Sequence, residues 1–151
     1  MESQETEQQI TDFLVAHRTA SLATVDGEGL PHAANLRYVS DDAWNLYWVS
    51  SPESDHSLHL ADQPRAAVTV YAPVDAPDEI HGLQMHGKAT AIHDDATISL
   101  VRALYEATYP FTAEPPYREA VEAQTFYRLR PRWVRWIDNR RGFGWKYEKT
   151  F

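Results

Sequence analysis

The stretch Leu46–Val70, LYWVSSPESDHSLHLADQPRAAVTV, changes its pattern twice and thereby decides the fold. An aromatic and apolar run ends at Ser50, and Ser51 and Pro52 follow, which suit a helix cap and a first helical position. A helix of about ten residues fits here and ends before Gln63 and Pro64, because the residue preceding a proline disfavours the helical region. An apolar strand then resumes. The stretch therefore predicts a strand, a short helix and another strand.

Most of the remaining chain also has the pattern of strands. Alternating or apolar runs between turn signals predict strands over 21–25, 30–39, 43–50, 66–72 and 80–92, and one or two more over 124–138. Helical periodicity predicts helices over 4–17 and 94–110. Short turns favour antiparallel neighbours, and helices inserted at the corners favour a barrel over a sandwich. We expect a mainly β fold of six or seven strands, whose interior is filled by side chains.

Length and composition limit the possible classes of protein. The 151 residues predict a single domain, 1–151, and the absence of cysteine excludes disulfides, thiolate metal sites and a cysteine nucleophile. The net charge of -8 argues against a nucleic-acid surface, although residues 126–151 carry eight Lys and Arg against two acids. No apolar run is long enough for a membrane span, and the acidic start MESQETEQQ differs from a secretory signal. We expect a cytoplasmic protein.

Two catalytic readings of the histidine-rich segment are weak. His56 and His59 are three residues apart on the predicted helix, but no third ligand is identifiable, so we expect no metal site. Ser54, Asp55 and His56 are the residue types of a hydrolase triad. Because adjacent residues point in different directions and no G-x-S-x-G motif is present, a triad is not expected.

An anion site fits the same segment better. Backbone N–H groups at the start of a helix attract phosphate, and Ser50, Ser51 and Ser54 add hydroxyl donors. A protonated His56 would add charge, and Arg37 on a preceding strand could reach the same end. Serines that only cap the helix explain the pattern equally well. Aromatic residues able to wall a planar ligand are Tyr38, Trp48, Trp133, Trp136 and Trp145. Together these features suggest a planar phosphorylated cofactor.

Four blocks of the chain, in order, resemble a known family. They are HAANLRYV (32–39), the opening stretch, IHGLQMHGKA (80–89) and WVRWIDNRRGFGWKYE (133–148). The blocks are similar to those of the pyridoxamine 5′-phosphate oxidase-like FMN-binding split-barrel proteins, above all to a small bacterial branch. The resemblance implies a six-stranded antiparallel split β-barrel with short flanking helices. It also implies a homodimer that binds FMN at the subunit interface.

The same resemblance implies which residues bind the cofactor. Asn35, Leu36, Arg37 and Tyr38 correspond to a strand along the flavin, Val49 and Ser50 to the next strand edge, and Ser54, Asp55 and His56 to the phosphate-binding turn. Gln84 would approach the ring edge, and Trp136 would pack on the flavin from the partner subunit. His56 stands where the oxidases have a phosphate-binding lysine. This difference predicts a less charged and pH-sensitive phosphate site.

The resemblance leaves the reaction open. The oxidases' substrate-binding Tyr, Arg and Ser set and their C-terminal His-x-Arg pair have no counterpart here, where RRGFGW (140–145) stands instead. We expect an FMN-dependent oxidoreductase acting on an unidentified small substrate or electron donor, with no catalytic side chain assigned. The alternatives are a non-catalytic flavin-binding or sensor protein, and a split barrel that binds haem or deazaflavin.

Overall fold

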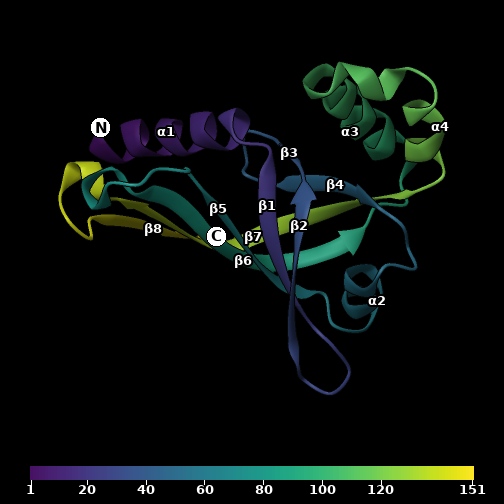
Figure 1. The fold of residues 1–151 in the computed structure, drawn as a ribbon, viewed down its shortest axis with the longest axis horizontal. Coiled ribbons are helices and arrows are strands. Elements are labelled where there is room, and N and C mark those ends of the chain that lie inside the picture. Colours follow the sequence, from purple (N-terminus) through teal and green to yellow (C-terminus); the bar gives the residue numbers. More distant parts are fainter.

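The computed structural model describes residues 1–151 and places eight strands in one antiparallel sheet (Figure 1). The strands are β1 (Thr19–Val25), β2 (Pro31–Arg37), β3 (Val39–Ser40), β4 (Leu46–Ser50), β5 (Arg65–Tyr71), β6 (His81–Ala91), β7 (Thr125–Asp138) and β8 (Lys146–Thr150). The α-helices are α1 (Glu2–Ala16), α2 (Asp55–Asp62), α3 (Asp95–Thr108) and α4 (Tyr117–Glu122). Short 3₁₀ turns are η1 (Pro77–Glu79), η2 (Pro110–Ala113) and η3 (Asn139–Arg141). The mainly β prediction with short flanking helices is confirmed.

The strand order shows how the sheet curls. Its path runs β2-β1-β5-β6-β7-β4-β3, with β8 paired to the far part of β7. The two ends of this path, β2 and β3, are separated in the chain by Tyr38 alone. Because one continuous segment forms both ends, the sheet must bend round until they meet, which makes a barrel that is open between β2 and β4. This opening is the split of the split barrel.

The strand number differs from the six that the resemblance implied. The C-terminal tail, for which the sequence pattern predicts no strand, forms β8 against β7, with Trp136 opposite Tyr147. The segment expected as one strand over 30–39 is divided at Tyr38 into β2 and the two-residue β3. Both additions are short edge pieces, so the antiparallel split-barrel architecture is unchanged.

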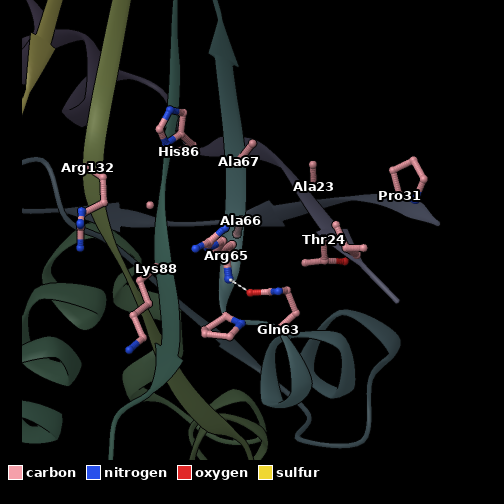
Figure 2. Close-up of a pocket in the computed structure, with 13 residues that line it drawn as sticks. Ala23, Thr24, Pro31, Gln63, Arg65, Ala66, Ala67, His86, Lys88 and Arg132 are labelled. Carbon is pink, nitrogen blue, oxygen red and sulfur yellow. Dashed lines mark hydrogen bonds between the residues drawn. The ribbon is translucent and has the colours of Figure 1, made fainter. Parts of the chain in front are cut away.

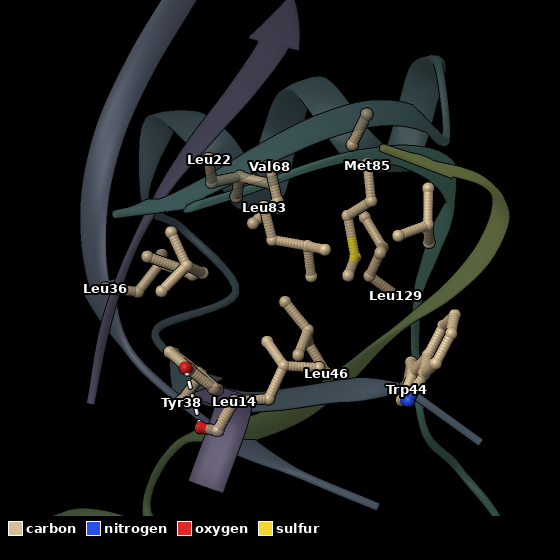
Figure 3. Close-up of a cluster of buried hydrophobic side chains, with 14 of the residues drawn as sticks. Leu14, Leu22, Leu36, Tyr38, Trp44, Leu46, Val68, Leu83, Met85 and Leu129 are labelled. Atoms are coloured by element: carbon tan, nitrogen blue, oxygen red, sulfur yellow. Dashed lines mark hydrogen bonds between the residues drawn. The ribbon is translucent and has the colours of Figure 1, made fainter. Parts of the chain in front are cut away.

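Apolar side chains fill the barrel, as the sequence predicted (Figure 3). Leu22, Val68, Leu83 and Leu129 come from four strands and are almost completely buried. Helix α1 closes one end of the barrel and adds Ile10, Phe13 and Leu14. The Tyr38 hydroxyl donates to the Leu14 carbonyl at 2.8 Å. Since no room remains inside, a ligand of cofactor size must bind on the outside of the barrel.

The helices occupy different sides of the sheet. Helices α3 and α4 lie together at one end, and a second apolar cluster that includes Val101, Tyr105 and Phe126 joins α3 to the sheet (Figure 1). Helix α2 lies against β1, β2 and β6, beside the split. None of the helices is long and apolar enough to cross a membrane.

Candidate functional site

The start of α2 gathers the hydroxyl and imidazole groups predicted from the sequence. Ser54 is the N-cap, and its Oγ accepts a hydrogen bond from the Ser57 backbone N–H at 3.4 Å. The Nε2 atom of His56 lies 2.9 Å from the Ser50 Oγ and 3.3 Å from the Ser54 Oγ. Strand β4 therefore delivers Ser50 to the first turn of α2. Ser50, Ser54 and His56 converge on one spot.

A cavity of about 240 Å³ adjoins this cluster. It is lined by Thr24, His32, Ala33, Ala34, Asp55, His56 and His59. His59 is fixed by a hydrogen bond of 2.9 Å to the Thr24 hydroxyl, and its ring packs on that of His32 at 4.5 Å between centroids. His32 bonds Asp26 at 2.8 Å, which lowers the pKa of that carboxyl to about 2. We name this cavity the helix-start pocket.

The helix-start pocket has little fixed positive charge. Its lining holds three histidines and one carboxylate, Asp55, but no lysine or arginine. Burial, and then the neighbouring His59, lower the pKa of His56 below its ordinary value of 6.5. Because the folded protein disfavours the imidazolium, His56 contributes stability above pH 6.5 and this contribution is lost as the pH falls further. Without a bound anion, the neutral imidazole therefore prevails near pH 7.

Beside the pocket, β2 presents an unpaired backbone edge. The backbone N–H of Tyr38 donates to the Arg18 carbonyl at 3.1 Å, which makes these two residues a hydrogen-bonded pair of the β1–β2 ladder. Hydrogen-bonded and non-bonded pairs alternate along an antiparallel ladder. The backbone groups of Ala33, Asn35 and Arg37 consequently point away from β1, toward the split. A planar ligand with donors and acceptors on its edge can bind there.

The other predicted residues of β2 and β4 take different directions. Leu36 and Tyr38 are buried in the barrel and their backbone groups pair with β1, so neither residue offers a hydrogen-bonding group to the split. The Arg37 side chain points outward and lies over the rings of Tyr109 and Phe111, at 5.1 and 5.2 Å. Val49 is half-buried and packs against the cluster around α3. Asp55 is exposed at the rim of the helix-start pocket.

Gln84 and Asn35 lie on the outer face of the sheet, in one row across four strands. Asn35 pairs with Ser21, Ser21 with Thr69, and Thr69 with Gln84. Three strand spacings put Gln84 about 14 Å from Asn35. Gln84 is therefore separated from the split of its own chain.

The structure does not support the expected role of Trp136. Its side chain is only 1% exposed, and its ring packs on Phe13 at 4.9 Å inside the barrel. The alternation of β7 explains this direction, because Val134, Trp136 and Asp138 are all buried. The prediction that Trp136 packs on a flavin of the partner subunit is therefore wrong for this conformation of the chain.

A second and larger cavity, of about 720 Å³, lies at the other end of α2 and was not predicted (Figure 2). Its cationic side chains are Arg65 of β5, Lys88 of β6 and Arg132 of β7, and His86 lies beside them. We name it the basic cleft. The signal for this cleft in the sequence was the presence of Lys and Arg at alternate positions of the predicted strands. Which strands lie next to each other was not evident from the sequence.

Comparison with known proteins places the chain in a family. A sequence model described as pyridoxamine 5′-phosphate oxidase matches residues 6–138. The UPF0306 protein PM1958 of Pasteurella multocida is 24% identical over 134 residues, which cover 88% of this chain and 84% of that protein. The match to the family extends from α1 to the end of β7, and it includes both cavities.

Solved structures have the same fold at low sequence identity. The conserved hypothetical protein Rv2991 of Mycobacterium tuberculosis superposes with a TM-score of 0.78 at 22% identity, over 89% of this chain and 85% of that one. A heme binding protein of Mycobacterium smegmatis gives 0.72 at 23%, over 91% of this chain and 55% of that one. An FAD-binding protein of Mesorhizobium loti superposes with a TM-score of 0.67 at 24% identity, over 84% of this chain and 90% of that one. By its sequence match and its fold, the chain belongs to the pyridoxamine 5′-phosphate oxidase family.

Proposed function

We propose that the protein binds FMN in the split of the barrel and acts as a flavin-dependent oxidoreductase on a small substrate. The observation that carries this proposal is the convergence of Ser50, Ser54 and His56 at the start of α2, next to the unpaired edge of β2. Membership in a family named for pyridoxamine 5′-phosphate oxidase supports it. So does the fold shared with an FAD-binding protein.

The residues present fit a flavin phosphate in a particular way. Two serine hydroxyls and the backbone N–H groups of the first turn of α2 supply donors for phosphate oxygens. The helix-start pocket holds no lysine or arginine, so a histidine would supply the positive charge by taking up a proton, and His56 is the histidine that lies against Ser50 and Ser54. The unpaired backbone groups of Asn35 and Arg37 would hold the polar edge of the ring.

The roles of this chain's residues are binding and orientation. When bound, FMN supplies the electron transfer, as cofactors generally carry the difficult chemistry of their enzymes. Asn35 and Arg37 fix the position of the ring through their backbone. The Arg37 side chain lies over Tyr109 at the margin of the split and is available to an anionic group of a substrate. No side chain of the chain need react covalently.

We also propose a homodimer that uses the outer face of the sheet. Ser21, Thr69 and Gln84 form a row across β1, β5 and β6, away from the basic cleft. Tyr71, on the same outer face of β5 as Thr69, is 71% exposed. In a dimer the partner subunit could bring its own Gln84 to the flavin. Within one chain, the separation of about 14 Å keeps Gln84 from the flavin.

Identification of the cofactor tests this proposal. We expect the purified protein to show flavin absorbance, mass spectrometry to find FMN, and NADH or NADPH to bleach the flavin without oxygen. A yellow protein that neither donor reduces would leave FMN binding intact and contradict the oxidoreductase. A colourless protein that does not quench the fluorescence of added FMN would contradict the flavin site itself.

Haem is the second candidate, because the fold is shared with a heme binding protein of Mycobacterium smegmatis. The same absorbance spectrum separates the candidates, since haem gives a Soret band and FMN does not. A deazaflavin is distinguished from FMN by its mass. A Soret band in the purified protein, with no flavin found, would replace the FMN proposal by the haem one.

A further inference from the structure

The basic cleft lies on a row of like charges on adjacent strands, of which Arg65 and Lys88 line the cleft. Arg65 lies directly opposite Lys88 in the β5–β6 ladder, and Lys88 lies directly opposite Arg130 in the β6–β7 ladder. All three side chains are exposed on the outer face, and no carboxylate lies within 4.0 Å of any of them. Like charges directly opposite each other destabilise a sheet. A chain with a net charge of -8 nevertheless places them together.

A β-bulge adds a fourth cation to this row. The β6–β7 register shifts between His86 and Gly87, so that Trp133 pairs with His86 and Pro131 with Gly87. Arg132 is the extra residue, and it lines the cleft. The bulge needs glycine on β6, because a Cβ atom on Gly87 would lie 2.0 Å from the Arg130 carbonyl oxygen. Bulges commonly redirect a side chain in this way.

Small apolar residues form the rest of the cleft. Ala23, Val25, Ala67, Pro31 and Pro64 lie among the thirteen residues that line it (Figure 2). His86 stands at one side, with its ring stacked on Trp133 at 5.0 Å between centroids. No acidic residue lines the cleft. The cleft thus combines a surface suited to a flat apolar group with cations suited to two or more anionic groups.

We propose that the basic cleft is a second binding site, which takes a small molecule with a planar body and at least two anionic groups. Arg65, Lys88 and Arg132 bind the anionic groups, and the alanines and prolines contact the planar body. The cleft shares only Thr24 with the helix-start pocket. This inference goes beyond the proposed flavin site, and it would hold with another cofactor in the split.

The anionic groups could be nucleotide phosphates or the carboxylates of a tetrapyrrole. Arginine and lysine bind both, so the cleft is defined by the chemistry that the two share. Two probes distinguish these sources: NADPH supplies phosphates, and metal-free protoporphyrin IX supplies carboxylates without a metal for a histidine to ligate. Adenosine, which has a planar ring but no phosphate, serves as the uncharged comparison.

Titration calorimetry on the full chain tests the site. We expect saturable binding of NADPH or of protoporphyrin IX, and no binding of adenosine at the same concentration. The variant Lys88→Gln should bind the probe about tenfold more weakly, because it removes one charge-assisted contact. The matched control Lys146→Gln changes an exposed strand lysine outside the cleft and should bind as the wild type does.

Three results would overturn this proposal. The first is that neither probe binds saturably. The second is that Lys88→Gln and Lys146→Gln bind the probe equally well. The third is that FMN displaces the probe in equimolar competition. The last result would assign the cleft to the flavin. The proposed flavin site is tested separately, since Lys88→Gln should leave FMN affinity unchanged and His56→Ala should leave probe affinity unchanged.

Discussion

The two cavities beside α2 offer an anion different kinds of binding. At the start of the helix, hydroxyls and a half-buried imidazole surround a pocket without lysine or arginine. At its end, Arg65, Lys88 and Arg132 line a cleft without any acid. The pocket can gain positive charge only by taking up a proton at a histidine, whereas guanidinium charge in the cleft is permanent. The two sites should therefore differ in how they respond to pH.

The cavities also differ in what holds their shape. The basic cleft depends on the backbone, because the bulge opposite Gly87 sets the direction of Arg132. The helix-start pocket depends on side-chain hydrogen bonds, because Ser54 caps α2 and Thr24 fixes His59. A substitution at Gly87 should therefore affect the basic cleft, and a substitution at the helix cap Ser54 should affect the helix-start pocket.

The largest effect is expected from Gly87→Val. The new side chain would collide with the backbone of Arg130 and Pro131, which belong to the longest strand of the sheet. We expect a loss of about 3 kcal/mol in the free energy of unfolding, measured with urea.

Gly27→Ala is the matched control for this substitution. Nothing lies within 4 Å of a Cβ atom at Gly27, which is in an exposed turn. We expect a change of less than about 0.5 kcal/mol. If Gly87→Val were as stable as Gly27→Ala, the backbone of β7 would not have to lie close to residue 87. The bulge that sets the position of Arg132 would then not depend on glycine there.

A smaller loss of stability is expected from Ser54→Ala, at the helix-start pocket. Loss of an N-cap serine costs about 1 kcal/mol, and here it also removes a hydroxyl next to His56. Urea unfolding and FMN titration measure the two consequences, and binding of NADPH or protoporphyrin IX in the cleft should not change.

Ser99→Ala, at an exposed position within α3, is the control and should be neutral in both assays. A Ser54→Ala protein with full stability and full FMN affinity would show that this cap neither holds the helix nor contacts the phosphate.

Local sequence signals predicted much of this structure. Ser51, Pro52 and Pro64 indicated a short helix between two strands, and the structure has α2 there. Its cap is Ser54 rather than the predicted Ser51, so the helix begins three residues later and is eight residues long. The hypothesis of a hydroxyl and imidazole cluster placed Ser50 and His56 at the same end of this helix. The structure brings them within hydrogen-bonding distance. These features depend on residues close together in the sequence.

Features that depend on strand pairing were missed. The basic cleft brings together Arg65, Lys88 and Arg132, which are far apart in the chain, and one of them is exposed there through a bulge. Strand β8 was not expected, because its residues become a strand only by pairing with β7. The burial of Trp136 follows from the alternation of β7, whereas the resemblance to the family implied an exposed ring at this position.

The pH dependence of FMN binding tests the central claim most directly. FMN titrations between pH 8 and pH 6 would compare the wild type with His56→Ala and with the exposed control His93→Ala. Burial lowers the pKa of His56 in the free protein, and a bound phosphate should raise it again. Protonation of the phosphate itself affects all three proteins alike, so the ratio of their dissociation constants reports on His56. We predict that His56→Ala binds FMN several-fold more weakly, by a factor that grows as the pH falls, while His93→Ala matches the wild type. A ratio of one at every pH would contradict the assignment of the flavin phosphate to the start of α2.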